Sequence, residues 1–157
     1  MTASVMEGAC ACNSVRWHST ARPTHLDFCY CLQCQRITGA PFGAWMGIAK
    51  DAITFEGERM HYRLSDIATR SFCAQCGGTL TIQYDCYPGK THVAAGSIVQ
   101  GMDVVPKVGC HLFVSRKPRW YDIPQDGVVR WDEFDDEFKT IEKAWRDGCA
   151  GDACGSQ

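Results

Sequence analysis

Three cysteines lie within six residues in the segment CYCLQC, at positions 29, 31 and 34. Thiolates bind transition metals, and a structural zinc is almost always held by four protein ligands. A catalytic zinc is typically held by three, which leaves one position open for water or substrate. Cys29, Cys31 and Cys34 are therefore predicted to form an open metal site that takes part in catalysis.

Two alternatives to an open site follow from the same residues. Cys86, Cys110 or His111 could supply a fourth ligand, which would close the site and make it structural. The three thiols could instead work as a relay without any metal.

Two further cysteine pairs predict a second cluster. GACAC contains Cys10 and Cys12 at i and i+2, so on a strand both sulfurs leave the same face. FCAQCGG contains Cys73 and Cys76 in a C-x-x-C turn, and the glycines that follow tolerate the backbone conformation of a chelating turn. Four thiolates predict a structural zinc, whose binding energy is also folding energy. Disulfides within or between the pairs, or buried free thiols, are the alternatives.

Short alternating segments predict the strands that must position these cysteines. In ERMHYRL, Met60, Tyr62 and Leu64 alternate with polar residues and are predicted to form a buried face. TLTIQY alternates in the same way, which predicts that its threonines face water. Further strands are predicted in SVRWHS, FGAWMGIA, ITF, THVAAG and HLFVS. The fold is predicted to be mainly β and antiparallel, with no helix before about residue 130.

The C-terminal region has a helical period instead. One apolar stripe at i, i+4, i+7 and i+11 consists of Phe134, Phe138, Ile141 and Trp145. Acidic residues crowd its start and basic residues its later turns, as the helix dipole favours. The stripe is expected to pack on the sheet or on a second subunit, so a homodimer is one expectation. The predicted organisation is a zinc-binding β domain at 1–130, an amphipathic helix at 131–148 and a disordered tail at 149–157.

The composition argues against several classes of protein. The 157 residues are 45% hydrophobic and 22% charged, and the formal net charge is −2, which gives no general attraction to nucleic acid or membranes. We find no secretory signal pattern, no apolar stretch of bilayer length, no phosphate loop and no dinucleotide-binding glycine motif. The 11 cysteines favour a reducing cytoplasm, where thiols stay available for metal or chemistry.

Five segments, taken in order, resemble the glutathione-dependent formaldehyde-activating enzyme family, which includes centromere protein V: GACACNSVRW, CYCLQCQRITGAPFGAW, SFCAQCGGTL, VAAGSI and HLFVSRKPRWYDI. The resemblance covers roughly residues 5–125 and places seven cysteines in register. It implies a zinc-stapled β-tent fold with a short C-terminal helix added. It also implies that Cys10, Cys12, Cys73 and Cys76 are structural zinc ligands, and that Cys29, Cys31 and Cys34 hold a second, catalytic-type zinc.

Two positions depart from the usual motifs of this family. The first motif usually runs C-x-C-Gly, where this chain has Asn13, and the second usually begins Cys-His-Cys, where this chain has Tyr30. Neither change removes a ligand. On a strand, residue 30 points away from the sulfurs of its neighbours, so Tyr30 is expected to change packing more than metal binding.

The resemblance implies a carbon–sulfur lyase or synthase that acts on glutathione adducts of formaldehyde or a related small aldehyde. A free thiol is mostly protonated at neutral pH, and zinc coordination deprotonates it, so the open position is where the sulfur of glutathione is expected. Three thiolates leave the zinc site with a net negative charge. The metal is therefore expected to orient a thiolate more than to polarise an aldehyde. With only three protein ligands it is also expected to be exchangeable, so the site can be partly empty.

Basic and aromatic side chains are the candidates for binding glutathione, because it carries two carboxylates. Arg36, two residues after Cys34, is predicted to bind the substrate, and Trp45 to wall the pocket. His92 and His111 are weaker candidates for an acid or base, since a histidine on a strand is commonly just packed there. Two alternatives to an enzyme are a carrier that binds glutathione or its adduct without catalysis, and a zinc-stapled interaction module.

Overall fold

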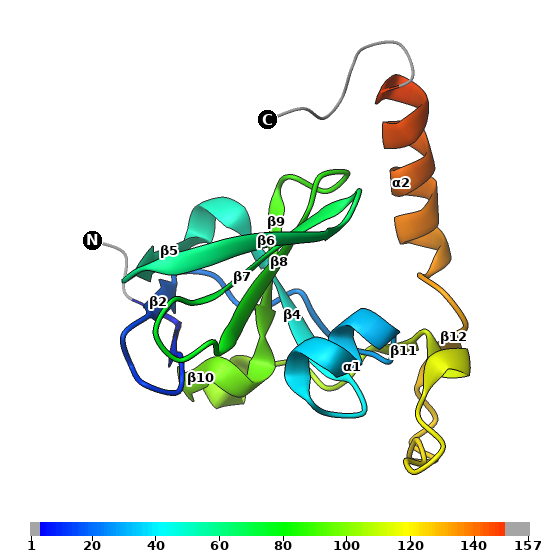
Figure 1. The fold of residues 1–157 in the computed structure, drawn as a ribbon, viewed down its shortest axis with the longest axis horizontal. Coiled ribbons are helices and arrows are strands. Elements are labelled where there is room, and N and C mark those ends of the chain that lie inside the picture. The colour runs from blue at the N-terminus through cyan, green and yellow to red at the C-terminus, as the bar shows by residue number, and fades with distance from the viewer. Residues whose placement is uncertain (1–3, 150–157) are drawn as a thin grey trace.

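The computed structural model describes residues 4–149, and within them the chain forms twelve strands in two sheets and two α-helices (Figure 1). The predicted tail falls outside these residues, apart from Cys149. The strands are β1 (Met6–Ala9), β2 (Arg16–Ser19), β3 (His25–Cys29), β4 (Gly43–Ala49), β5 (Ile53–Glu56), β6 (Arg59–Ser65), β7 (Ala68–Cys73), β8 (Thr79–Tyr84), β9 (Lys90–Ala94), β10 (Ile98–Gln100), β11 (Cys110–Leu112) and β12 (Val129–Trp131). The helices are α1 (Leu32–Thr38) and α2 (Asp136–Cys149), with 3-10 turns η1 (Lys50–Ala52), η2 (Ala95–Ser97), η3 (Met102–Val104) and η4 (Val114–Arg116).

The strands form a small and a large sheet. The small sheet has the order β10-β1-β2-β5, and the large sheet has the order β12-β11-β3-β4-β9-β8-β7-β6. The prediction of a mainly β fold is confirmed. The expected antiparallel pairing is wrong for β11, which runs parallel to both β3 and β12. A parallel pair needs a long crossover, and here the strands from β4 to β10 supply it.

One face of the large sheet packs against the small sheet. Met46 and Ile48 of β4 and Val93 of β9 point to this side, where they meet Met6 of β1 and Trp17 of β2 in one buried cluster. Because successive side chains on a strand point to opposite faces, the same strands must present their other residues on the far side of the sheet. That far face carries the candidate site.

Burial on β6 and β8 differs from the prediction. Met60, Tyr62 and Leu64 were expected to be buried, but they are 48%, 53% and 37% exposed, because β6 is an edge strand of the large sheet. Thr81 of β8 was expected to face water, but it is buried because both faces of this inner strand are covered. The alternation of polar and apolar residues therefore located both strands correctly. It did not show which face of each strand is covered by the rest of the fold.

A short helix, α1, stands where none was predicted. The Cys31 side chain caps its start by accepting a hydrogen bond from the backbone N–H of Cys34 at 3.4 Å. Gly39 ends it with a φ of +64°, a left-handed conformation that glycine adopts freely. The helix has only seven residues, which is too few for a helical period to emerge from the sequence.

The C-terminal helix exists as predicted, although it begins later than residue 131. Residues Val129–Trp131 form β12 beside β11, so the chain is extended where the helix was expected to start. Asp135 then caps α2, because its Oδ1 accepts a hydrogen bond from the backbone N–H of Phe138 at 2.8 Å. The helix continues to Cys149, one residue beyond the predicted end.

The apolar stripe of α2 packs within the chain. Phe138 and Trp145 contact the buried cluster on the far face of the large sheet, and Arg146 pairs with Asp66 between β6 and β7 at 2.8 Å. Figure 1 shows α2, in orange to red, standing beside the sheets next to β12. In residues 4–149 we find no helix with both the length and the apolar character needed to cross a bilayer.

Gly8 offers a test of the packing between the small sheet and its surroundings. A Cβ at this position would lie 2.2 Å from the Trp17 ring and 2.4 Å from the carbonyl oxygen of Ser97. We expect Gly8→Ala to lower the free energy of unfolding by about 1–3 kcal/mol, as overpacking does, measured by urea denaturation. Gly96→Ala is the control, because a Cβ there would meet no atom within 4 Å. Equal urea midpoints for the two variants would contradict this packing.

Candidate metal centres and the adjoining cavity

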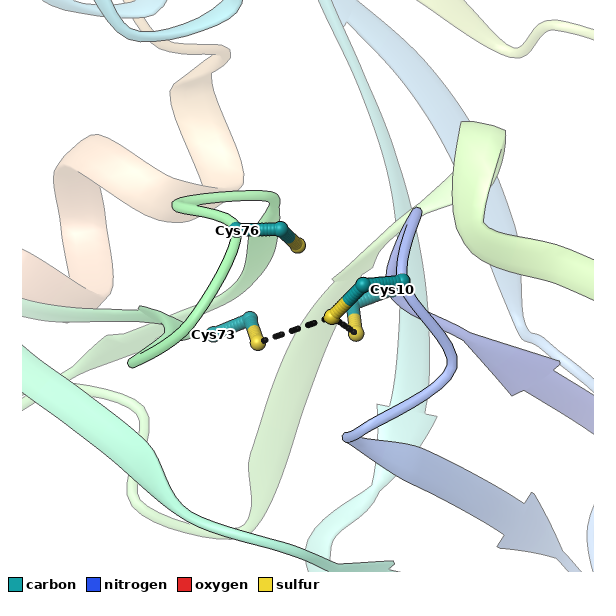
Figure 2. A group of neighbouring side chains, drawn as sticks. Cys10, Cys73 and Cys76 are labelled. Carbon is teal, nitrogen blue, oxygen red and sulfur yellow. Dashed lines mark hydrogen bonds between the residues drawn. The ribbon is translucent and has the colours of Figure 1, made fainter.

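The two cysteine pairs predicted to form a structural site lie together (Figure 2). Cys10 follows β1 and Cys12 lies in the turn before β2, while Cys73 ends β7 and Cys76 lies in the turn before β8. The four Sγ atoms are all within 4.8 Å of one another, with Cys10–Cys12 at 3.6 Å and Cys12–Cys73 at 3.8 Å. Zn–S bonds of about 2.3 Å in a tetrahedron require sulfurs roughly 3.8 Å apart. The four thiols therefore fit a zinc ion.

Hydrogen bonds around this cluster favour the thiolate of Cys12, the form that binds metal, whereas the pKa of Cys73 is raised to about 11 because desolvation and the neighbouring thiols outweigh its backbone hydrogen bonds. The backbone N–H of Val15 donates to the Sγ of Cys10 at 3.2 Å. The neighbouring Ser14 lowers the pKa of Cys12 from its usual value of 9.0 to about 6. A pKa in this range leaves Cys12 largely ionised at neutral pH, as a metal ligand must be.

The turn at Asn13 explains one departure from the family motif. Asn13 has a φ of +61°, in the left-handed region. Glycine, the family's usual residue, reaches this region freely, and asparagine is among the few other residues that tolerate it. The substitution therefore keeps the backbone path between Cys12 and β2. On the other side of the cluster, Gly77 has a φ of +70° and its N–H donates to the carbonyl of Cys73 at 3.0 Å.

The structure also brings together Cys29, Cys31 and Cys34. Cys29 ends β3, Cys31 caps α1 and Cys34 lies in its first turns, and their Sγ atoms are within 4.8 Å of one another. Among the residues from 4 to 149, no fourth cysteine, histidine, aspartate or glutamate joins this group. The alternative that Cys86, Cys110 or His111 closes the site is therefore not supported by the geometry. Three sulfurs with the spacing of zinc ligands leave one coordination position for another molecule.

The electrostatics of this cluster also suit a metal. Hydrogen bonds from the Cys29 and Cys34 thiols lower the pKa of Cys31 well below its usual value, so Cys31 is the first to ionise, while its hydrogen bonds, its charge and burial raise the pKa of Cys29 and Cys34. Arg70 of β7 is only 7% exposed, and its Nη2 lies 3.8 Å from the Sγ of Cys34. This buried cation offsets the negative charge that three thiolates bring to the site.

Tyr30, between the first two thiols, faces the opposite way. Its hydroxyl lies 3.1 Å from the Nδ1 of His111, and the Nε2 of His111 lies 2.9 Å from the Oδ2 of Asp126. A carboxylate only accepts, so Nε2 donates to Asp126, and a neutral ring then accepts the tyrosine proton at Nδ1. Tyr30 and His111 are both fully buried. His111 thus anchors the segment between Cys29 and Cys31 from behind and has no free nitrogen for catalysis.

A cavity of about 610 Å³ lies beside the three-cysteine cluster, between the large sheet and α2. Cys29 is the member of the cluster that lines it. The sheet contributes a floor that includes His25, Asp27, Cys29, Trp45, Tyr84 and His92. The C-terminal segment contributes a roof that includes Trp131, Phe134, Phe138 and Ile141. Asp135, Asp136, Glu137 and Lys90 add charged groups to the lining.

The two residues predicted to contact the substrate differ in position. Trp45 lines the cavity, as expected for a wall residue. Arg36 is exposed on α1 and does not line this cavity. On a helix, two residues correspond to roughly 200° of rotation, so Arg36 points away from the side on which Cys34 is buried. The prediction treated this segment as a turn and so placed Arg36 beside the thiols.

Arg70 is the main site residue that sequence reasoning missed. It lies on β7, a strand that was not predicted, three residues before Cys73. The alternation of Ala68, Arg70 and Phe72 with Thr69, Ser71 and Cys73 was the available signal, since it places a charged residue on the same face as a small apolar one. An arginine in that position needs a buried partner, and the thiols supply it.

His92 makes the stability of this region depend on pH. Burial, together with the smaller effects of the nearby His25 and Lys90, lowers its pKa from 6.5 to about 3. The folded protein therefore binds fewer protons than the unfolded chain between pH 6.5 and about 3, so its stability is complete above this range and falls as the pH falls. We expect a loss of up to about 1.4 kcal/mol per pH unit from His92, measured by urea unfolding between pH 7.5 and 5.

His92→Gln isolates this contribution. Burial also lowers the pKa of His25, which adds to the slope, and raises the pKa of Asp27, which opposes it. Both groups remain in the variant, as does Tyr84, whose ring contacts His92. The variant should show a smaller loss of stability on acidification than the native protein. Identical slopes would mean that His92 keeps an ordinary pKa.

Comparison with known proteins supports the fold and the family. Residues 5–116 match the family model described as glutathione-dependent formaldehyde-activating enzyme. Over 78 residues the chain is 30% identical to an uncharacterized lyase of Schizosaccharomyces pombe, in an alignment that covers 50% of this chain and 57% of that protein. The chain thus spans little more than half the length of this relative.

A solved structure has the same fold. A crystal structure of a Rhodobacter sphaeroides protein superposes with a TM-score of 0.51 and 19% sequence identity. The superposition covers 80% of this chain and 99% of that one. At this identity the likeness concerns the fold.

Proposed function

Because the chain belongs to the glutathione-dependent formaldehyde-activating enzyme family, we propose that it forms and cleaves the carbon–sulfur bond between glutathione and formaldehyde or a related small aldehyde. One observation carries the proposal: Cys29, part of a three-thiol cluster, lines a cavity of about 610 Å³. Binding sites for small molecules typically have volumes of about 300–1,000 Å³. The name of the Schizosaccharomyces pombe relative, a lyase, agrees with this class of reaction.

The two clusters have different roles in this proposal. Cys10, Cys12, Cys73 and Cys76 hold a zinc ion that ties the β1–β2 turn to the β7–β8 turn. Cys29, Cys31 and Cys34 hold a second one. When bound there, Zn²⁺ would lower the pKa of a thiol that reaches the open position. The thiols of both clusters must stay reduced, which suits the cytoplasm.

The remaining groups bind and orient the substrate. Arg70 offsets the charge of the thiolates, so a further thiolate can approach. Asp135, Asp136 and Glu137 attract the ammonium group of glutathione, while Lys90 can pair with a carboxylate. The aromatic roof excludes water from the bond that forms, which strengthens these electrostatic contacts.

Cys34→Ala tests the proposal, with Cys86→Ala as the matched control. Both cysteines are buried, but Cys86 lies outside either cluster. We expect two zinc ions per chain in the native protein and in Cys86→Ala, and one in Cys34→Ala. Acceleration of adduct formation should fall by more than about 100-fold in Cys34→Ala, since even substitutions around the ligands of a metal site reduce activity 10–100-fold.

The rate must be measured as exchange, because thiols add to formaldehyde without help. Two-dimensional exchange NMR between formaldehyde hydrate and S-hydroxymethylglutathione reports the catalysed and uncatalysed rates in one sample. Native protein that binds glutathione but leaves the exchange rate unchanged would be a carrier. Retention of both zinc ions in Cys34→Ala would show that the three thiols do not bind metal. That result would refute the proposed zinc-dependent activity.

A further inference from the structure

Three buried side-chain atoms in the described part of the chain have no hydrogen-bond partner: Trp45 Nε1, Arg70 Nη1 and His92 Nδ1. Buried polar groups are almost always paired, and an unpaired donor in a low-dielectric interior is costly. Trp45 is 4% exposed and Arg70 is 7% exposed, so water from outside does not reach their nitrogens freely. A site that keeps two such donors unpaired is built for an acceptor that arrives with a ligand.

The register of the large sheet places these groups on one face. Gly47 of β4 pairs with His92 of β9, His92 pairs with Ile82 of β8, and Ile82 pairs with Arg70 of β7. Paired residues share a face, and Trp45 shares that of Gly47, two residues along the same strand. This is the face that carries Cys29 and the cavity.

Two of the donors lie beside the three-cysteine cluster. The Nη2 of Arg70 is 3.8 Å from the Sγ of Cys34, and its Cζ is 5.7 Å from the centre of the Trp45 ring. The indole nitrogen of Trp45 lies over Gly43, where a Cβ would approach it to 2.5 Å. Gly43 is the residue paired with Cys29 across β3 and β4. Both side chains therefore lie near the three-cysteine cluster, although of the two only Trp45 lines the cavity.

We propose that Arg70 and Trp45 form an oxygen-binding pair, which donates hydrogen bonds to an oxygen on the carbon attached to the substrate sulfur. This inference rests on the proposed function. It assigns the substrate class as thiol adducts with an S–C–O arrangement, which hemithioacetals and thioesters share. Both residues contact the reacting oxygen and are catalytic residues.

The reaction needs such donors because it develops charge on oxygen. The substrate sulfur gives an electron pair to the carbonyl carbon, the carbon–oxygen π electrons move to the oxygen, and an alkoxide forms. The proton released by the thiol reaches that alkoxide through water and completes the hydroxyl. In cleavage the hydroxyl loses its proton, the carbon–sulfur electrons return to sulfur, and the aldehyde leaves. Donors fixed at the oxygen lower the barrier in both directions.

The carboxylates of glutathione are poorer candidates for this pair. They lie several bonds from the sulfur, whereas Arg70 and Trp45 lie next to the thiols. Where the C-terminal segment lines the cavity, its charged groups are all acidic: Asp135, Asp136 and Glu137. An oxygen close to the sulfur therefore meets donors, whereas a carboxylate beside the C-terminal segment meets like charge and has Lys90 as its cationic partner in the cavity.

Trp45→Phe and Arg70→Lys test the pair. Trp45→Phe removes the N–H and keeps an aromatic ring, while Arg70→Lys keeps the positive charge beside Cys34 and removes the second guanidinium nitrogen. Each variant should lower kcat for adduct formation and cleavage by about 100-fold, with the KM for glutathione and the zinc content unchanged. Trp120→Phe is the control, because Trp120 is 73% exposed and lies outside the cavity.

A binding measurement separates this inference from the proposed activity. S-acetylglutathione has an oxygen on the carbon attached to sulfur, and S-ethylglutathione lacks it. The native protein should bind the acetyl compound about tenfold more tightly, and this preference should vanish in Trp45→Phe. Arg70→Lys supplies the second comparison, with circular dichroism confirming that each variant is folded.

The outcomes distinguish the two claims. Preference for the acetyl compound in a protein that accelerates no exchange would support the oxygen-binding pair and refute the lyase. If Trp45→Phe and Arg70→Lys both keep the native kcat, the oxygen-binding pair is refuted and the proposed lyase activity is unaffected. Equal affinity of the native protein for the two compounds would also refute the pair.

Discussion

Replacing Cys10 by alanine is expected to abolish cooperative folding. Cys10 supplies one of four thiols whose sulfurs have the spacing of zinc ligands, and it also accepts the N–H of Val15 at 3.2 Å. A structural zinc in such a cluster contributes about 10–16 kcal/mol of apparent binding energy, which equals or exceeds the whole stability of a typical domain of about 5–15 kcal/mol. The cluster joins the β1–β2 turn of the small sheet to the β7–β8 turn of the large sheet. Its loss therefore removes a link between the two sheets.

Thermal unfolding followed by circular dichroism, with zinc measured on the same samples, checks this expectation. Cys86→Ala is again the control, since it removes a buried thiol without touching either cluster. Chelation of the native protein should reproduce the loss of folding in Cys10→Ala, because it removes the ion of the four-cysteine cluster along with any ion at the three-cysteine cluster. A Cys10→Ala protein with the native melting temperature would mean that the four thiols do not stabilise the fold through a metal.

His111→Phe is expected to lower the free energy of unfolding by about 2–4 kcal/mol and to weaken metal binding at the three-cysteine cluster. Phenylalanine fills a similar volume but leaves the hydroxyl of fully buried Tyr30 without its partner at 3.1 Å. Tyr30 lies between Cys29 and Cys31, so a loss of its anchor allows both sulfurs to move. Urea unfolding and a competition titration with a zinc chelator measure the two effects.

Two further variants test whether the effect of His111→Phe comes from its contact with Tyr30. Tyr30→Phe removes only the hydroxyl and should cost about 1 kcal/mol. Combined with His111→Phe it should add little, because the two changes break the same contact. His61→Phe makes the same substitution at an exposed position on β6 and should leave both measurements near their native values. Additive losses in the double variant would show that Tyr30 and His111 act independently.

The cysteine clusters could be foreseen because metal chemistry constrains spacing within short segments. A C-x-x-C turn followed by glycine, and three thiols within six residues, need only local geometry to suggest ligands. The pairing of Cys10 and Cys12 with Cys73 and Cys76, about 60 residues away, followed from counting ligands: a four-thiol site needs two pairs. Strand positions also followed from alternation, as in β8, which spans the predicted segment.

Features that depend on tertiary context could not be foreseen in the same way. Met60 and Tyr62 alternate correctly but lie on an edge strand, and only the strand order reveals that. Arg70 of β7 lies beside Cys34 of α1 although 36 residues separate them in the sequence, a contact that no local pattern reveals. β3 pairs in parallel with β11, which lies far along the chain. The aromatic roof of the cavity also comes from distant residues, those after position 130.

The cavity is assembled from two stretches of chain that need not evolve together. The thiols, Trp45 and Arg70 all lie within residues 5–116, the part that matches the family, whereas the roof residues Trp131, Phe134 and Phe138 lie beyond it. The roof also packs against the buried cluster that contains Cys29, Cys34 and Trp45, so a mutation there changes the shape of the cavity and reaches the thiols through that contact. Under the proposed function, a chimaera with another roof would accept different adducts, because the thiols come from the matched residues and the roof does not.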